Sequence, residues 1–235
     1  MKILLCMLVR NERECLSIML PKLPAPGPES GFDALVAVDG NSTDGTPELL
    51  AQWGVETLKQ TRRGRGAAYL EVMEKYSADA YLFFSPDGNE DVADFPKFRW
   101  HLEQGADLVI ASRMSTGAVN EEDSHFFRPR KAANLAFNFL ANLAFRKRGP
   151  YVTDSINGFR AIRRDLVQKL ALDANDYTIE YQMTMRALAW RAKIAEFPTH
   201  EYPRLAGDTG APSIPTGIAF LRCFFRELQR PRPAI

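Results

Sequence analysis

Two oxygen-bearing side chains lie in a turn that follows a short, strongly apolar segment. The run over residues 81–84 stops at Pro86 and Gly88, which predicts a buried strand followed by a tight turn. Asp87 and Asn89 lie in this turn with no Cys or His beside them, and their oxygen atoms suit a Mg²⁺ or Mn²⁺ ion that shares substrate phosphates. In an open α/β sheet, ligands bind at this carboxyl edge of the strands. An Asx turn that only ends the strand is an equally open alternative.

Two further segments place polar residues after predicted strands. Asp39 ends a short buried strand, and residues 40–46 have turn chemistry that leads into a helix with Pro47 in its first turn. Residues 62–68 follow a weak strand and combine arginines with glycines at a helix start, where backbone amides can approach an anion. This segment lacks the spacing of a Walker loop or a dinucleotide fingerprint, so a generic loop is equally open.

A regular alternation of strands and helices must position these turns. Asn11 is expected to cap the first helix, which runs to residue 20 before a Pro-rich loop at 21–33. The alternation favours right-handed parallel crossovers, and therefore an α/β fold with a mostly parallel central sheet flanked by helices. The strands of this first half are predicted at residues 2–9, 34–38, 55–58, 81–84 and 107–111.

The second half is predicted to be mainly helical. A loop at 114–129 precedes a helix at 130–146, in which Asn and Arg recur every four residues as one narrow polar stripe. Such a helix is buried or lies against lipid, and burial is the preferred interpretation. The last helix combines an apolar and a basic face, which permits membrane-surface docking as well as ordinary packing. The elements after residue 146 are helices at 163–171, 177–191 and 217–229, and a strand at 193–198.

Length and charge limit the number of domains and the kinds of ligand. At 235 residues with 46% hydrophobic content, the chain is predicted to form one domain with one sizeable core. Residues 1–127 carry 12 Lys and Arg residues against 20 Asp and Glu residues, whereas residues 128–235 carry 18 against 9. The acidic half suits a cation site, and the basic half suits phosphate or an anionic membrane surface.

The cysteines and the apolar runs predict a cytoplasmic protein. Cys6, Cys15 and Cys223 are odd in number and lack metal-ligand spacing, which indicates a reducing environment. The apolar run at residues 2–9 is short, lacks a cleavage site and is followed at once by charged residues, so we interpret it as a strand rather than a signal peptide. No run reaches the roughly 18 apolar residues of a transmembrane helix.

An ordered series of motifs extends along residues 3–208. In sequence order they are residues 9–12, residues 39–46, residues 63–68, the Asp87 turn, Ser112 with Arg113, residues 154–160, and Arg204 with Gly207. Their order resembles the family 2 glycosyltransferases, and within them the dolichol-phosphate mannose synthase and polyprenyl-phosphate glycosyltransferase branch. The resemblance implies a GT-A fold, a nucleotide-binding α/β sandwich, formed by a single domain over residues 1–235. Residues 1–113 would be its donor-binding half, and residues 114–235 its acceptor-binding half with a C-terminal amphipathic helix.

The resemblance also implies roles for individual residues. Asp87 and Asn89 would bind the metal, Mg²⁺ or Mn²⁺. Asp154 and Glu180 would act as a general base or orient the acceptor, and with Arg160 they form the expected catalytic set. The anionic group of the acceptor would be received by Ser112, Arg113, Arg128 and Arg160. The donor would be bound by Asn11, Glu12, Asp39, Arg63, Gly66, Asp87 and Arg204.

The implied reaction is an inverting, metal-dependent transfer from a nucleotide-diphosphate sugar to a polyprenyl phosphate or another cell-envelope saccharide acceptor. Breaking the bond from sugar C1 builds negative charge on the leaving phosphate, so a metal and arginines stabilise the transition state more than the ground state. An acceptor phosphate is already ionised, whereas a sugar hydroxyl would need a carboxylate as base. No nucleic acid partner is expected, and peripheral contact at the inner face of the membrane is left open.

Two positions depart from the family pattern. Ser85 occupies the first position of the usual Asp-x-Asp turn, and Thr209 with Gly210 stands where the late loop usually has a Ser-Lys pair. These departures keep open a nucleotide-sugar-binding protein with weak or no transferase activity. A nucleotidyltransferase on a similar sheet is a further alternative, although the segment after the first strand lacks the Gly-rich, Arg-bearing signature of that class.

Overall fold

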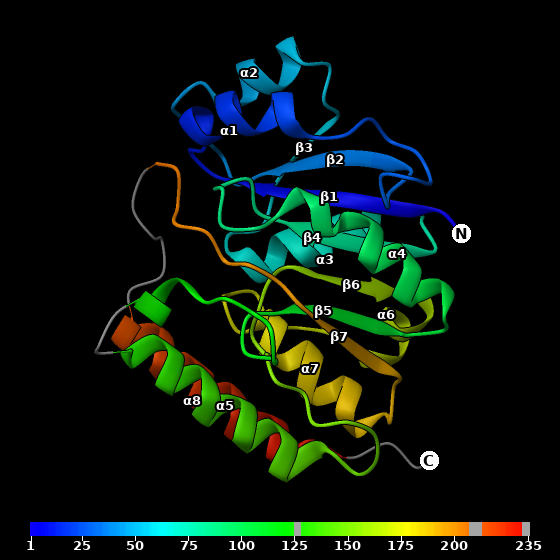
Figure 1. Cartoon of the computed structure of the whole chain (residues 1–235), viewed down its shortest axis with the longest axis vertical. Coiled ribbons are helices and arrows are strands. Elements are labelled where there is room, and N and C mark those ends of the chain that lie inside the picture. Colours follow the sequence, from blue (N-terminus) through cyan, green and yellow to red (C-terminus); the bar gives the residue numbers. More distant parts are fainter. Residues whose placement is uncertain (125–127, 207–212, 232–235) are drawn as a thin grey trace.

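A mixed sheet forms the centre of the molecule, and helices cover both of its faces (Figure 1). The computed structural model describes residues 1–124, 128–206 and 213–231. Within these residues the sheet has seven strands in the order β3-β2-β1-β4-β6-β5-β7. The predicted α/β architecture is therefore confirmed. The strands are β1 (Ile3–Val9), β2 (Ala34–Asp39), β3 (Thr57–Lys59), β4 (Ala80–Phe84), β5 (Leu108–Ser112), β6 (Arg160–Arg163) and β7 (Ile194–Pro198).

Two groups of helices enclose the sheet. One face is covered by α1 (Arg13–Met19), α2 (Thr46–Gln52) and α4 (Phe95–Glu103). The other face is covered by α3 (Arg65–Lys75), α5 (Pro129–Phe145), α6 (Arg164–Leu170), α7 (Ile179–Ala189) and α8 (Ser213–Gln229). Short 3-10 turns add η1 (Leu20–Lys22), η2 (Val92–Asp94) and η3 (Glu121–Ser124).

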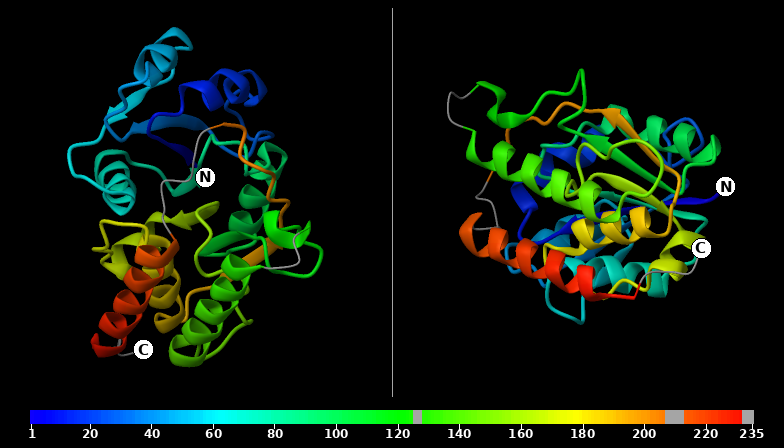
Figure 2. Two further views of the ribbon diagram at one scale, coloured as in Figure 1. Left: turned by 90° about the vertical axis from the view of Figure 1, so that its left-hand side faces the viewer. Right: turned by 90° about the horizontal axis from the view of Figure 1, so that it is seen from below.

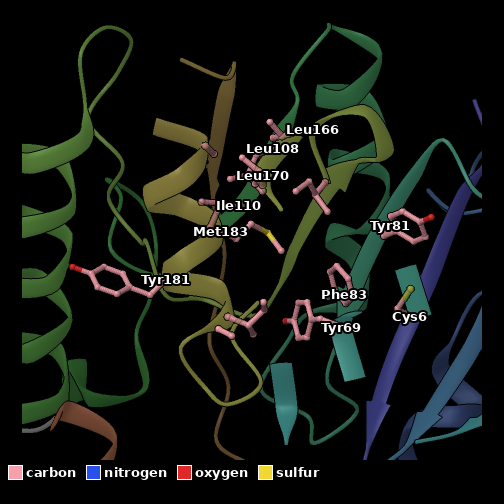
Figure 3. Packing of buried hydrophobic residues seen from close by; sticks show 14 of the residues in the cluster. Cys6, Tyr69, Tyr81, Phe83, Leu108, Ile110, Leu166, Leu170, Tyr181 and Met183 are labelled. Atoms are coloured by element: carbon pink, nitrogen blue, oxygen red, sulfur yellow. The ribbon is translucent and has the colours of Figure 1, made fainter. Parts of the chain in front are cut away.

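The central strands build two hydrophobic cores with the two-residue period of a strand. The odd-numbered residues of β1 belong to the core beneath α1, α2 and α4, and its even-numbered residues belong to the core on the opposite face. In that second core Tyr69 of α3 stacks on Phe83 of β4, with ring centroids 3.8 Å apart (Figure 3). Cys6, Cys15 and Cys223 are buried free thiols. This packing holds β4 rigidly, and the Asp87 turn begins at its carboxyl end.

Strand β6 departs from the predicted order. It runs antiparallel between β4 and β5, where Ile162 pairs with Tyr81 and Ala161 pairs with Val109. The other strand pairs are parallel. Four residues with arginine at both ends have no hydrophobic period, so the sequence predicts only a turn and a helix there. The sheet is mostly parallel as predicted, but this reversal brings residues 157–159 to the carboxyl edge of β4 and β5.

Asn11 does not cap the first helix, so that prediction is wrong. Helix α1 begins after Glu12, whose side chain forms no capping hydrogen bond, and Arg13 N donates instead to Asp44 Oδ2 at 3.0 Å. Asn11 has a φ of 55°, in the left-handed region that Asn tolerates better than most residues. Its Oδ1 accepts a hydrogen bond of 2.8 Å from Thr43 N. The side chain therefore ties the turn after β1 to the turn after β2.

The helix predicted at residues 130–146 is α5, and the middle of its polar stripe, Asn138 and Asn142, is buried. Asn142 Oδ1 accepts from Val152 N at 2.9 Å, and Asn138 Oδ1 accepts from Ser155 N at 2.8 Å. The prediction that the whole helix is buried is wrong, because the buried amides pair with backbone groups while the opposite side faces outward. That outer stripe is apolar and exposed, by 49%, 55% and 69% for Leu135, Phe139 and Leu143.

Helix α8 carries a second exposed apolar stripe and lies beside α5 (Figure 2). Its inner side packs on α5 through Phe220, whose ring centroid is 5.2 Å from that of Phe137. None of the described helices has the length and apolar character needed to cross a bilayer. The exposed fractions of the α8 stripe range from 39% to 58% for Ile218, Leu221, Phe225 and Leu228.

Candidate active site

The turn after β4 opens into a pocket at the carboxyl edge of the sheet. Asp87 and Asn89 line this pocket together with residues from the ends of β5 and β7 and from the segment before β6. Its volume is about 200 Å³. Charged and polar groups dominate the wall, so the turn that was predicted to bind a metal lies in a concave polar site. The lining residues are Arg65, Ser85, Asp87, Asn89, Glu90, Arg113, Asn157, Gly158, Phe159, Thr199, His200 and Glu201.

The segment after β7 crosses this turn and is hydrogen-bonded to it. Two of its backbone N–H groups donate to carbonyl oxygens of the turn, with N···O distances of 2.9 and 3.0 Å. Arg204 Nη1 lies 3.0 Å from Asp87 Oδ2, and its Nη2 pairs with Glu12 Oε1 at 2.5 Å. Arg204 thus joins two predicted donor-binding residues from the ends of β1 and β4. The predictions for residues 207–210 fall outside the described residues.

Carboxyl groups crowd this pocket. Burial raises the pKa of Asp87, and the hydrogen bond from Asn89 N and the charge of Arg204 oppose that rise. Burial and the neighbouring Asp87 raise the pKa of Glu90 well above its ordinary value. The crowding therefore favours neutralisation of these groups, either by protons or by a bound cation.

Arg113 lines the pocket, and the predicted base Asp154 lies behind it. Asp154 is completely buried, and its Oδ2 accepts from Arg113 N and Nε at 3.0 and 2.8 Å. Its Oδ1 accepts from Arg113 Nη2 at 3.0 Å. The same guanidinium reaches Glu201 Oε1 at 2.8 Å. Because both Asp154 oxygens are occupied by one arginine, this geometry argues against a general base and indicates that Asp154 positions Arg113.

Glu180 has the same relation to Arg65. It is buried in the first turn of α7, and its Oε1 lies 2.7 Å from Arg65 Nε and accepts from Tyr69 OH at 2.9 Å. Burial alone would lower the pKa of Arg65, but the Glu180 carboxylate raises it above its ordinary value. Arg65 therefore stays charged, with its two Nη atoms 3.5 and 3.4 Å from Ser85 Oγ. Glu180 supports this arginine and does not line the pocket.

Arg160 is a structural residue, so its predicted place in the catalytic set is corrected. Its side chain is completely buried, and burial lowers its pKa. The guanidinium donates to Thr184 Oγ1 at 3.0 Å and to three backbone carbonyls, those of Ser155, Asn157 and Glu180, at 3.2, 2.5 and 2.8 Å. It does not line the pocket, because carbonyls of the chain reversal before β6 and two groups of α7 accept its hydrogen bonds.

Two of the predicted acceptor-binding residues also lie outside the pocket. Ser112 Oγ is buried, shares a hydrogen bond of 2.7 Å with Thr153 Oγ1 and accepts from two backbone N–H groups. Arg128 is exposed at the start of α5, where its Nη1 is 3.1 Å from Asp123 Oδ1. Of the residues predicted to bind the acceptor, Arg113 lines the pocket. Ser112 holds the turn after β5, and Arg128 forms an ion pair at the start of α5.

Asn11 and Asp39 meet at the adjoining edge formed by β1 and β2. Asn11 N donates to Ser42 Oγ at 2.8 Å, and the buried Asp39 carboxylate accepts from Ser42 N at 3.2 and 3.3 Å. Arg63 is exposed before α3, and its side chain forms no hydrogen bond or ion pair with any described residue. The edge that carries Asp87 therefore continues into a second polar region, where Asn11 and Asp39 face the turns after β2 and β3.

Gly66 serves helix packing and does not present an anion site. A Cβ at this position would lie 2.2 Å from the carbonyl oxygen of Ala174. Gly66 N donates to Asp176 O at 3.1 Å, and Ala67 N donates to Asn175 O at 3.2 Å. The first amides of α3 are therefore occupied by carbonyls from residues 174–176. The prediction that these amides approach an anion is wrong, because a distant segment satisfies them first.

Most of the chain is matched by the model of a known family. A family model described as "Glycosyl transferase family 2" matches residues 6–171 of the chain. The chain belongs to glycosyl transferase family 2. This confirms the family predicted from the motifs, and with it the enzyme class that the family name denotes.

Individual relatives agree with membership of family 2. Glycosyltransferase AglJ of Haloferax volcanii is 31% identical over 204 residues, which are 84% of this chain and 64% of that protein. Undecaprenyl-phosphate mannosyltransferase of Micrococcus luteus is 29% identical over 223 residues, 89% of this chain and 87% of that protein. The latter confirms the predicted resemblance to polyprenyl-phosphate transferases.

A solved structure supports the same fold. Glucosyl-3-phosphoglycerate synthase from Mycobacterium tuberculosis, in complex with Mn²⁺, uridine diphosphate and glucosyl-3-phosphoglycerate, matches with a TM-score of 0.73 at 19% identity. The match covers 100% of this chain and 82% of that one. The predicted GT-A fold of this family 2 member is therefore confirmed.

The pocket of this family 2 member fits a divalent cation in part. Asn89 Oδ1 and Glu12 Oε2 are buried and have no hydrogen-bond partner among the described residues. They are hard oxygen atoms, and together with Asp87 they are the ligand type that Mg²⁺ and Mn²⁺ prefer. The described residues contain no ready cluster of three His, Cys, Asp or Glu side chains. A cation would therefore take part of its ligands from donor phosphates and water.

Sequence reasoning missed four charged or titratable residues of the pocket. Arg65 belongs to the motif at 63–68, and Glu90 directly follows the predicted metal turn, so both could have been found by extending these motifs. His200 and Glu201 had no comparable signal, because only the pairing of β7 beside β5 brings them to the pocket.

Proposed function

We propose that this chain transfers a sugar from a nucleotide-diphosphate sugar to a phosphate-bearing acceptor, with inversion at the anomeric carbon and with Mg²⁺ or Mn²⁺. The observation that carries the proposal is the joining of Glu12, Asp87 and Arg204 across the sheet edge. It joins the turn that we propose for the cation to the guanidinium that we propose for phosphate, and departure of a diphosphate needs both kinds of group. Binding of Mn²⁺ and a uridine nucleotide by the solved structural neighbour supports it.

The chain's own groups would act on the leaving diphosphate. A divalent ion held by Asp87 and Asn89 would supply positive charge next to the diphosphate. Arg204 would turn from the carboxylates of Glu12 and Asp87 toward the phosphate oxygens, where guanidinium groups form strong paired hydrogen bonds. Because the charge on the leaving group grows as the bond to C1 breaks, these interactions favour the transition state over the bound donor.

The arrangement of Arg65 and Arg113 favours a phosphate acceptor. Both guanidinium groups line the pocket, and each is held by a buried carboxylate, Glu180 or Asp154. These two carboxylates were the predicted bases, and both are occupied. An acceptor phosphate is ionised before it attacks and needs no base, whereas a sugar hydroxyl would need one. We therefore propose a polyprenyl phosphate as acceptor, the class that the name of the Micrococcus relative contains.

The donor site can be tested by thermal unfolding in the presence of nucleotide sugars. We expect one of the UDP-, GDP- or CMP-sugars to raise the Tm only when Mn²⁺ or Mg²⁺ is present, because Asp87 and Asn89 supply only part of the metal's ligands. A polyprenyl phosphate added to that donor should then yield a glycosylated lipid. A Tm that no nucleotide sugar shifts would refute the transferase proposal, and donor binding without transfer to any acceptor would support a binding protein instead.

The helices α5 and α8 suit contact with an anionic membrane surface, and we propose this peripheral, cytoplasmic-side location for the chain. Each helix has an exposed apolar stripe, and the two helices pack on one another. Amphipathic helices with basic flanks lie in the headgroup region of bilayers. A polyprenyl phosphate would be reached from such a position. The exposed basic residues on and after these helices are Arg130, Arg146, Lys147, Arg148, Arg222, Arg226 and Arg230.

We expect the full chain to float with anionic vesicles, and the double variant Leu143→Asp with Phe225→Asp to lose at least about 90% of that binding. Each of these side chains is more than half exposed, at 69% and 58%, so their loss should hardly change the fold. Burying one such side chain in lipid is worth about 1.5–3 kcal/mol, which corresponds to a tenfold change or more. Vesicle flotation measures the bound fraction.

The matched control is Trp100→Asp. Trp100 is 57% exposed on α4, on the opposite face of the sheet. Its replacement removes an equally exposed apolar group and should leave flotation unchanged. Wild-type protein that stays at the bottom of the gradient, with vesicles of any charge, would contradict the membrane proposal.

A further inference from the structure

Ser85 leaves the metal turn without the acid that its first position usually carries, and a second carboxylate lies against the backbone of this position. Glu90 follows the turn and folds back across it, so that its Oε2 accepts a hydrogen bond of 2.8 Å from Ser85 N. Glu90 also lines the same pocket as Asp87 and Asn89. A carboxylate from the end of the turn therefore contacts the backbone of the position that lacks the acid.

Glu90 is the carboxylate of this pocket that lacks a cationic partner. Asp87 is paired with Arg204, and Glu201 is paired with Arg113. Among the described residues Glu90 forms no ion pair within 4 Å, and the nearby Arg65 is bound to Glu180. Glu90 and Asp87 are like charges in one partly buried pocket, an arrangement that a divalent cation between or beside them relieves.

We propose that Glu90 is the second acidic group of the metal-donor site and does for this chain what an aspartate at position 85 would do. The inference rests on the proposed function and deepens it, because it assigns the site's acids as Asp87 and Glu90. The hydrogen bond from Ser85 N holds the Glu90 carboxylate against the turn. A cation held by Asp87 and Asn89 would therefore meet a second carboxyl group that is already in position, and its charge would favour the ionised form of Glu90.

The test measures Mn²⁺ affinity in the presence of UDP, from the electron paramagnetic resonance signal of free Mn²⁺. Glu90→Gln keeps the side-chain shape and removes the charge, and we expect it to weaken Mn²⁺ binding by about 10- to 100-fold. Asp91→Asn makes the same chemical change one residue later, outside the pocket lining, where Asp91 only accepts a hydrogen bond from Ala93 N. We expect this control to bind Mn²⁺ like the wild type.

The double variant Ser85→Asp with Glu90→Gln gives the decisive comparison. It returns the acid to the first position of the turn, so Mn²⁺ affinity should recover most of what Glu90→Gln alone loses. Wild-type affinity in Glu90→Gln would overturn the proposal, as would a double variant that binds no better than the single one. If wild-type protein binds no Mn²⁺ with UDP, and none when UDP is replaced by GDP or CMP, the proposed transferase function fails together with this inference. If the wild type and Glu90→Gln bind Mn²⁺ equally well, only the proposed role of Glu90 is refuted, and the proposed transferase function stands.

Discussion

Replacing Asp87 by alanine is expected to abolish metal-dependent binding of the nucleotide-sugar donor and to lower transfer by at least about 100-fold. Asp87 is the residue on which the turn, the proposed cation and Arg204 converge. Its loss removes a proposed metal ligand and also releases Arg204 from one of its two carboxylate partners. Calorimetric titration with UDP-sugar and Mn²⁺ measures the binding, and product formation measures the transfer.

The fold should survive this change. The Asp87 side chain lies in a polar pocket, and burial already raises its pKa, so its removal relieves a crowded group. Asp79→Ala is the matched control, because Asp79 is an exposed aspartate that precedes the opposite end of β4. This control should retain donor binding. Wild-type affinity in Asp87→Ala would show that the metal binds elsewhere.

Replacing Arg160 by methionine is expected to lower the free energy of unfolding by about 4 kcal/mol or more. The buried guanidinium donates to three backbone carbonyls and one hydroxyl oxygen. Methionine fills much of the volume but removes four hydrogen bonds from the core, and each buried polar group that is left unsatisfied costs roughly 1–3 kcal/mol. Urea denaturation measures the change.

Arg164→Met provides the comparison for Arg160→Met. Arg164 is an exposed arginine in the first turn of α6, close in sequence to Arg160, and it bonds only to Ser77 Oγ through its side chain. We expect its replacement to change stability by less than about 0.5 kcal/mol. A stable Arg160→Met protein that has lost transfer activity would instead restore the catalytic role that the motif order predicts.

The position of the metal turn could be predicted because it depends on local pattern. An apolar run that stops at Pro86 predicts a strand end, and in a mostly parallel sheet the carboxyl ends share one edge. Asp39 and Asp87 were placed at that edge by this reasoning, and the structure has both there. Strand β6 was not predicted in this way, because its four residues have no hydrophobic period. Its place in the sheet is defined only by the two strands beside it.

The burial and the pairing of each charged group could not be predicted, because they depend on partners far away in the chain. Arg65 and Glu180 are 115 positions apart, and Arg204 and Glu12 are 192 apart. Glu180 has a side chain that suits a base, and Arg160 one that suits an anion-binding group. The fold buries both of them and uses their hydrogen-bonding atoms. The inward-facing Asn138 and Asn142 of α5 likewise follow from backbone groups at residues 152–155.

By itself the sequence determined the α/β class, the family and the edge at which the chemistry lies, because these depend on short patterns and on their order along the chain. Tertiary structure alone decided which polar groups line the pocket, which are buried as supports, and that the Glu90 carboxylate lies against the backbone of Ser85. The physical reason is that burial and ion pairing depend on the neighbours of a residue in three dimensions, and the hydrophobic periodicity of a sequence does not identify those neighbours.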